Sequence, residues 1–159
     1  MPIVDLLILL VVANGAPIVA HHLFGARFTR PLDGGRHWLD GRPIFGRAKT
    51  LRGIFFALLV TALAAPLLGY DACLGLGVAA LAMAGDLLSS FLKRRMGLAS
   101  SGMALGLDQI PESLLPAWVL RGAFGLDGRD ALTVSAVFFL LELLLSALLY
   151  AIGLRKQPY

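Results

Sequence analysis

A short segment at residues 85–95 combines one acid, two hydroxyl groups and a basic triplet at the end of a stretch otherwise apolar enough to cross a membrane. On a helix that turns about 100° per residue, Asp86, Ser90 and Lys93 lie within a narrow sector of one face. A carboxylate at membrane depth is costly unless a cation compensates it. Because Mg²⁺ prefers oxygen ligands and basic side chains neutralise phosphoryl groups, the segment predicts a magnesium ligand in Asp86 and phosphate contacts from Lys93 and Arg94. An internal salt bridge between Asp86 and Lys93, beside a topogenic basic cluster, is the alternative.

The next apolar stretch begins with a second acidic group, formed by Asp108 and Glu112 with Gln109 between them. Asp108 and Glu112 are one helical turn apart and therefore neighbours on one face. Since Asp86 closes one apolar stretch and Asp108 opens the next, both should lie near the same membrane level, close enough for one shared metal ion or two. Alternatively, Asp108 is only a helix N-terminal acid that the helix dipole stabilises.

Basic residues alternate with glycines between residues 40 and 53, directly before another apolar stretch. Glycines let backbone N–H groups approach phosphate oxygens, a helix start adds a positive dipole, and Lys49 and Arg52 add full charges. The segment therefore predicts a phosphate-binding loop. It lacks the glycine spacing and the strand of a Walker motif. A solvated basic loop that faces lipid headgroups is the alternative.

The composition excludes a water-soluble globule, because 58% of the 159 residues are hydrophobic, only 15% are charged, and the mean hydropathy is +0.80. A span needs about 20 mostly apolar residues. Five stretches meet this requirement: 2–24, 51–69, 72–92, 104–124 and 131–154. We therefore expect an all-α, polytopic membrane protein with five spans and cytoplasmic loops, and one catalytic domain over residues 1–159. The first stretch lacks a basic n-region and a clear cleavage site, so it predicts a retained helix.

The distribution of basic residues orients this bundle. If five spans alternate, nearly all basic residues fall on one side: Arg27, Arg30, Arg36, Arg42, Arg47, Lys49 and Arg52 around the first loop, Lys93, Arg94 and Arg95 at the second, and Arg155 and Lys156 in the tail. The positive-inside rule then places the N-terminus outside the cell membrane and both long loops and the C-terminus in the cytoplasm. Their position beside the spans favours lipid headgroups and phosphorylated substrates over nucleic acid as partners.

Three further features lie inside the apolar stretches. Asn14-Gly15-Ala16-Pro17 interrupts the first one and permits a kink whose freed backbone groups could line a cavity. His21 and His22 follow it, and adjacent histidines point about 100° apart on a helix, so interfacial packing is expected rather than chelation. Glu142, deep in the last stretch, should form hydrogen bonds within the bundle.

Taken together, the motifs resemble the CDP-archaeol synthase family, in order and over nearly the whole chain. They are Asn14-Gly15-Ala16-Pro17, Pro31-Leu32-Asp33-Gly34-Gly35, Asp40-Gly41-Arg42-Pro43-Ile44-Phe45-Gly46, Lys49-Thr50-Leu51-Arg52-Gly53, Gly85-Asp86 with Ser90-Phe91 and Lys93-Arg94-Arg95, and Leu107-Asp108-Gln109. The resemblance implies a five-span enzyme, related to the CDP-diacylglycerol synthases, that transfers CMP from CTP to the phosphate of a membrane lipid and releases pyrophosphate. The larger synthases have a Lys-Asp pair before Ser-Gly, where this chain has Ala99-Ser100-Ser101-Gly102.

The resemblance also implies roles for individual residues. Asp86 and Asp108 would hold Mg²⁺ and, with Lys93, form the catalytic group. The residues that would bind CTP are Lys49, Thr50, Arg52, Gly53, Ser90, Arg94 and Gln109. The lipid phosphate would enter laterally from the bilayer, and ether-linked isoprenoid or ester-linked acyl chains would both suit an apolar groove.

Two other functions are compatible with parts of the sequence. A CDP-alcohol phosphotransferase would need two further aspartates on consecutive helix turns after Asp33-Gly34 or Asp40-Gly41, and these are missing. A small membrane transporter or assembly subunit could bind cations with its buried acids. The position of Lys49, Arg52 and Lys93 near one cytoplasmic mouth argues against it.

Overall fold

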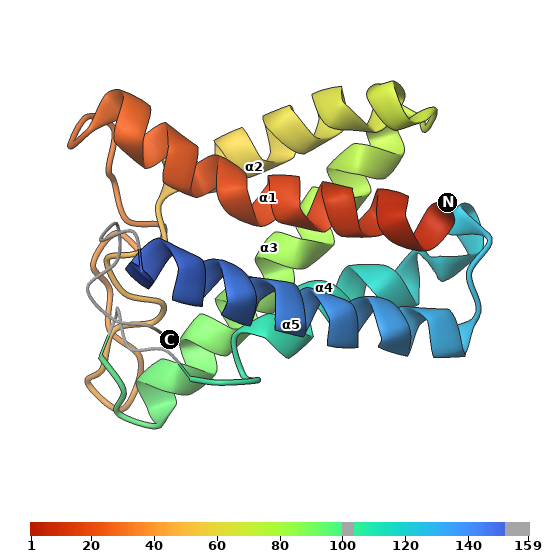
Figure 1. Ribbon diagram of the computed structural model, residues 1–159. Helices are drawn as coiled ribbons and strands as arrows, with labels where there is room; N and C mark the ends of the chain where they lie inside the picture. The colour runs from red at the N-terminus through yellow and green to blue at the C-terminus, as the bar shows by residue number, and fades with distance from the viewer. Residues whose placement is uncertain (100–103, 152–159) are drawn as a thin grey trace.

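The computed structural model describes residues 1–99 and 104–151, and these form an all-helical bundle (Figure 1). The α-helices are α1 (Pro2–Phe24), α2 (Leu51–Ala64), α3 (Ala72–Arg95), α4 (Gln109–Val119) and α5 (Gly128–Ala151), with short 3-10 helices η1 (Ala65–Leu68) and η2 (Arg121–Phe124). The described ranges contain no strand, only two isolated bridges that pair Pro31 with Thr50 and His37 with Pro43. The all-α, polytopic class expected from the sequence is confirmed.

The number of spans differs from the sequence prediction. Within the described residues, four helices are long and apolar enough to cross a membrane: Pro2–Phe24, Leu51–Leu68, Ala72–Arg95 and Gly128–Leu148. The expected span at 104–124 was wrong as a full crossing, because its α-helix has 11 residues and rises only about 16 Å. A hydrogen-bonded turn at Gly106, whose φ is +79°, delays the start of the helix, and Gly125, with φ +67°, ends η2. The expected end of the last span, at 154, lies outside the described residues.

The helices nevertheless alternate between the two ends of the bundle. Figure 1 shows loop 25–50, the start of α2 and the final turns of α1, α3 and α5 at one end, and the N-terminus, η1 and the η2–α5 turn at the other. α4 begins partway along the bundle, and α4 and η2 together bring the chain back to the end that holds the N-terminus. The two basic clusters described by the structure therefore share one end. Arg155 and Lys156 lie outside the described residues.

Small residues let the helices approach closely, which suits packing in a bilayer. A Cβ atom added at Gly75 of α3 would lie 2.5 Å from the carbonyl oxygen of Thr61 in α2, and one at Gly85 would lie 2.2 Å from the carbonyl oxygen of Pro111 in α4. The core between these contacts is apolar and holds the buried side chains of Leu6, Leu9, Leu10, Val78, Ala82, Ala117, Val134 and Phe138. α3 is thus held against both α2 and α4.

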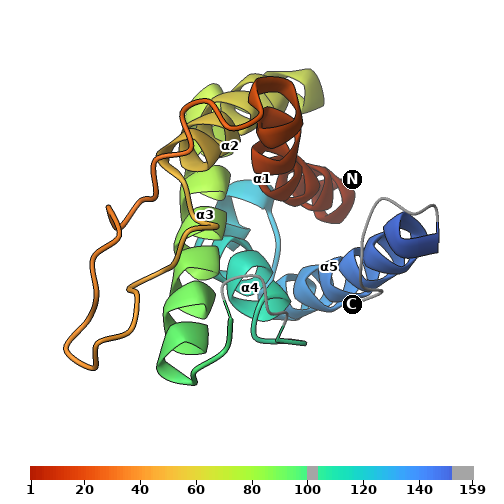
Figure 2. The same ribbon diagram turned by 90° about the vertical axis from the view of Figure 1, so that its left-hand side faces the viewer.

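Loop 25–50 is ordered around one buried carboxylate. Asp33 is 8% exposed and accepts hydrogen bonds from the backbone N–H groups of Gly35 (2.9 Å), Phe45 (3.0 Å) and Gly46 (3.0 Å). Burial alone would raise the pKa of Asp33, but the N–H donors outweigh it and hold this pKa below its ordinary value. Figure 2 shows this loop lying along the final turns of α3.

Candidate active site

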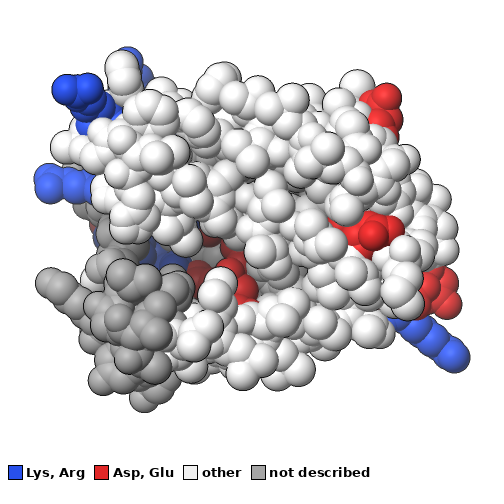
Figure 3. All heavy atoms as spheres, turned by 45° about the horizontal axis from the view of Figure 1, so that its top comes forward, with Lys and Arg blue, Asp and Glu red and all other residues white. Residues whose placement is uncertain are grey.

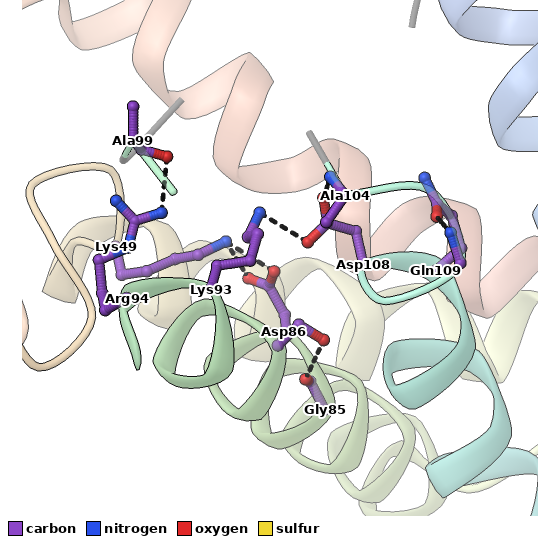
Figure 4. Close-up of polar contacts among 11 residues, drawn as sticks. Lys49, Gly85, Asp86, Lys93, Arg94, Ala99, Ala104, Asp108 and Gln109 are labelled. Atoms are coloured by element: carbon purple, nitrogen blue, oxygen red, sulfur yellow. Dashed lines mark hydrogen bonds and ion pairs between the residues drawn. The ribbon is translucent and has the colours of Figure 1, made fainter. Parts of the chain in front are cut away.

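Two lysine–carboxylate pairs form the centre of the site (Figure 4). Lys49 Nζ donates to both carboxylate oxygens of Asp86, at 2.6 and 2.5 Å. Lys93 Nζ lies 2.6 Å from Asp108 Oδ1. All four side chains are largely shielded from solvent, with exposed fractions between 10% and 24%. Charges held in such surroundings interact more strongly than at an open surface.

The α3–α4 contact brings the two pairs together. Because Gly85 packs against the backbone at Pro111 and Glu112, Asp86 is adjacent to the helix crossing, and Asp108 precedes α4 by one residue. Figure 4 shows the two carboxylates and the two amines directed toward one another. Figure 3 shows a hollow with acidic and basic atoms at its floor and mostly uncharged surface around it. The expectation that Asp86 and Asp108 lie at one level agrees with this placement.

The structure adds Glu112 to this group. Its side chain is 6% exposed and interacts electrostatically with Asp86, Asp108, Lys49 and Glu142 of α5. The position of Glu112 one turn after Asp108 was the sequence signal for this proximity. Glu142 has an interaction of its own, and its charge acts on Glu112.

The turn before α4 is held by its own polar side chains. Asp108 Oδ2 accepts a hydrogen bond from the backbone N–H of Ala104 (3.0 Å), and Gln109 Oε1 accepts one from Gly106 (2.9 Å). Gln109 is fully buried, and its Nε2 has no hydrogen-bond partner among the described residues. A buried donor of this kind is costly unless a ligand or water satisfies it.

Two other predicted nucleotide contacts lie on α3. Ser90 is 2% exposed, one turn before Arg94. Arg94 is 5% exposed and donates from Nη2 to the carbonyl oxygen of Ala99 at 2.6 Å. It also interacts electrostatically with Asp108. Arg94 therefore connects the end of α3 to the segment that leads toward Asp108.

Three residues predicted to bind nucleotide have local structural partners instead. Thr50 caps α2, because its side chain accepts a hydrogen bond from the N–H of Gly53 at 3.1 Å. Gly53 lies where α2 packs closely against α1, since a Cβ atom at this position would lie 3.3 Å from Pro17 Cβ. Arg52 donates to the carbonyl oxygens of Gly25 (3.0 Å) and Arg27 at the end of α1. The described contacts thus do not bring these three residues to the Asp86–Asp108 pair.

A reciprocal contact between loop 25–50 and α3 was not predicted from the sequence. Arg42 Nη1 donates to the carbonyl oxygens of Arg94 (3.3 Å) and Arg95 (2.5 Å) at the end of α3. Arg95 in turn binds the Asp40 carboxylate and donates to the carbonyl oxygens of Arg42 (3.3 Å) and Pro43 (2.6 Å). We call these contacts of Asp40, Arg42 and Arg95 the arginine clamp. Helix C-termini attract cations, but sequence spacing does not indicate which distant arginine supplies the charge.

The carboxylates fit a magnesium ion that binds together with a nucleotide. Mg²⁺ is usually held by one or two carboxylates plus substrate phosphates and water, rather than by a closed protein cage. Asp86 and Asp108 supply two such carboxylates on adjoining elements. Within the described ranges, no group of three or more His, Cys, Asp or Glu residues is arranged to hold a metal by itself.

Comparison with solved structures defines the class of protein. A structure described as an intramembrane enzyme for archaeal membrane lipids biosynthesis superposes with a TM-score of 0.73 and 32% identity, and the match covers 88% of this chain and 89% of that chain. The chain is therefore a multi-pass membrane enzyme of lipid biosynthesis. No family model matches the chain.

Comparison with known sequences identifies the family. The chain is 31% identical to the CDP-archaeol synthase of Sulfurisphaera tokodaii over 93% of its own length and 89% of that relative, and 34% identical to that of Methanosphaerula palustris over 90% and 96%. A shorter match, with the synthase of Hyperthermus butylicus, is 36% identical and spans 62% of this chain and 59% of that relative. The chain belongs to the CDP-archaeol synthase family. It is a CTP-dependent cytidylyltransferase that forms a CDP-activated lipid.

Proposed function

We propose that CTP and a membrane lipid phosphate react at the group formed by Asp86, Asp108, Lys49 and Lys93. The observation that carries this proposal is the convergence of two lysine–carboxylate pairs from three segments of the chain, at a largely shielded position. Shielded cations are effective at stabilising charge that develops on phosphoryl oxygens.

The reaction needs no covalent intermediate on the protein. An oxygen of the lipid phosphate attacks the α-phosphorus of CTP, a new phosphorus–oxygen bond joins CMP to the lipid phosphate, and the bond to pyrophosphate breaks. Positioning and charge neutralisation supply most of the catalysis in such transfers. Lys49 and Lys93 would exchange their carboxylate contacts for phosphate oxygens, and Arg94 would help to neutralise the leaving pyrophosphate.

Asp86 and Asp108 would hold Mg²⁺ in this arrangement. When bound, the metal supplies positive charge at the triphosphate. The unpartnered Nε2 of Gln109 offers a donor to the nucleotide, and Ser90 supports the same face of α3. Thr50, Arg52 and Gly53 would act less directly, because they fix the start of α2 and thereby the position of Lys49.

The topology proposed for the cell membrane follows from the basic end of the bundle. Loop 25–50 and the final turn of α3 would face the cytoplasm, where CTP is available, and the N-terminus would lie outside. The lipid would keep its chains in the bilayer while its phosphate reaches the charged group. Ether-linked isoprenoid chains and ester-linked acyl chains are both candidates for the acceptor.

The proposal is tested with purified protein, CTP, Mg²⁺ and a panel of lipid phosphates. We expect release of pyrophosphate and formation of a CDP-lipid, and a decrease of about 100-fold or more in turnover for Asp86→Asn and Asp108→Asn. Asp5→Asn is the matched control, because Asp5 lies in the first turn of α1, and α1 starts at the opposite end of the bundle. Full turnover by folded Asp86→Asn would contradict the proposed role. Cation transport without nucleotide binding would favour the transporter instead.

A further inference from the structure

A second concave site lies where α1 ends and α2 begins. This pocket has a volume of about 530 Å³ and is lined by four phenylalanines, Leu51, Arg30 and Arg52. The phenylalanines are Phe24, Phe28, Phe55 and Phe56. Its walls are almost entirely apolar, and none of its lining residues takes part in the ion pairs of Asp86 and Asp108. The pocket thus shares no residue with the ion pairs proposed to carry the reaction.

A buried positive charge borders the pocket. Arg52 is only 8% exposed, and its guanidinium is held by carbonyl oxygens of loop 25–50 and by His21 Nδ1 at 3.2 Å. Because arginine can only donate, Nδ1 of His21 is the acceptor in this contact. The described residues provide no carboxylate within ion-pair distance of Arg52, and its Nε has no hydrogen-bond partner among them. Arg52 therefore adds positive charge behind the apolar wall, and the exposed Arg30 supplies charge that a ligand can reach. Together the two arginines favour an anion at this site.

The backbone at Phe28 is a second, independent sign of a binding site. Phe28 has φ of +58°, a left-handed conformation that is strained for a bulky residue, and its side chain is 77% exposed. Phe55, which also lines the pocket, is 59% exposed. Covering these exposed rings with hydrocarbon chains would lower the free energy, because it removes apolar surface from water.

We propose that this pocket binds an anionic membrane lipid that is distinct from the acceptor of the reaction. Its chains would contact the phenylalanines, and its phosphate would lie near Arg30 and Arg52. The location supports this occupant, because the pocket lies between two candidate membrane spans at the basic end of the bundle. Anionic headgroups are attracted to such clusters of basic residues.

Native mass spectrometry of the full chain tests the proposal directly. The protein is incubated with equal amounts of phosphatidylglycerol and phosphatidylcholine that carry the same chains. We expect preferential retention of one phosphatidylglycerol molecule. Phe55→Ala and Arg30→Gln should each decrease this retention about tenfold, because they remove apolar contact or the exposed positive charge.

Two control variants match these changes. Leu63→Ala removes an exposed side chain from the same helix, and Arg36→Gln removes an exposed charge from the same loop; neither residue lines the pocket. Both should retain phosphatidylglycerol as the unchanged chain does. Equal retention of the two lipids, or equal loss in the control variants, would overturn the proposal.

Kinetics separate a distinct lipid site from the acceptor site. With the acceptor varied at saturating CTP, Arg30→Gln should leave the KM for the lipid phosphate unchanged. If Arg30→Gln raised this KM while kcat stayed constant, the pocket would hold the acceptor, and the distinct site would be refuted. The binding measurement needs no turnover, so its result does not depend on the proposed residue roles in catalysis.

Discussion

At the scale of single residues, each of the two aspartates of the site is paired with one lysine from another segment. Lys49 comes from the end of loop 25–50 and pairs with Asp86 of α3, whereas Lys93 of α3 pairs with Asp108 at the start of α4. Carboxylates at this depth would be costly without such partners. In the proposed reaction, each lysine that leaves a carboxylate would meet a phosphate of the triphosphate, so the number of contacts made by the lysines would change little.

The sequence indicated these four residues but not their partners. Helical periodicity predicted that Asp86 and Lys93 share a face, and the order of the apolar stretches predicted that Asp108 lies nearby. It also allowed a salt bridge between Asp86 and Lys93, whereas the structure pairs each with a residue from another segment. Arg52 shows most clearly what the sequence does not predict, because the direction of its side chain is set by carbonyl oxygens at the end of α1.

Asp33 gives a prediction about pH and stability. Its pKa is lowered in the folded chain, so its stabilising effect is fully present above the ordinary value near 3.8 and is lost as the pH falls through the lowered pKa. Asp33→Asn should therefore decrease the free energy of unfolding by about 2 kcal/mol near neutral pH, because three backbone donors lose a charged acceptor. The difference from the unchanged chain should shrink toward about pH 3. Chemical denaturation in detergent at both pH values measures it, and an equal difference at both would refute this role.

At the scale of elements, the crossing of α3 and α4 determines whether the two acids meet. Gly85→Ala should destabilise the protein by about 1–3 kcal/mol and weaken CTP binding, because the added methyl group would overlap the backbone at Pro111 and Glu112. Gly77→Ala is the matched control on the same helix, since its Cβ would lie 3.6 Å from Leu120 Cδ1, an ordinary contact. Thermal unfolding and CTP titration check both variants. Equal effects at the two glycines would contradict the importance of this crossing.

The arginine clamp positions loop 25–50, and with it Lys49, against α3. Arg42→Ala removes the donor to the last carbonyl oxygens of α3, so we expect the KM for CTP to rise about tenfold while the helical content measured by circular dichroism is unchanged. Arg47→Ala serves as the control, because Arg47 is an exposed charge in the same loop and outside the clamp. If both variants raised the KM for CTP equally, the effect would come from the loss of positive charge in the loop and not from the loss of the clamp contacts.

Element lengths were predicted with unequal success. The first stretch was confirmed at 2–24, because its apolar run ends at a sharp change to glycine and arginine. The stretch at 104–124 was misjudged, because the turn that delays α4 depends on hydrogen bonds that the side chains of Asp108 and Gln109 accept from backbone N–H groups. These contacts form only in the folded chain, and a hydropathy profile contains no information about them.

At the scale of the whole molecule, the charged group and the membrane orientation are linked. In the proposed topology the basic end faces the side that supplies CTP. The opposite end carries the only cysteine of the chain, Cys73, in the first turn of α3. Cys73 is exposed. A membrane-impermeant maleimide should therefore label Cys73 when it is added to intact cells or right-side-out vesicles.

The reciprocal variant completes this test of orientation. In a chain with Cys73→Ala and Arg36→Cys, the thiol lies in loop 25–50, at the end of the bundle where α1 finishes. This thiol should react with the same reagent only after the membrane is opened or in inverted vesicles. Labelling of the loop thiol from outside, together with protection of Cys73, would reverse the orientation. Since the reagent distinguishes the two ends by access alone, the result is independent of the number of full crossings that α4 contributes.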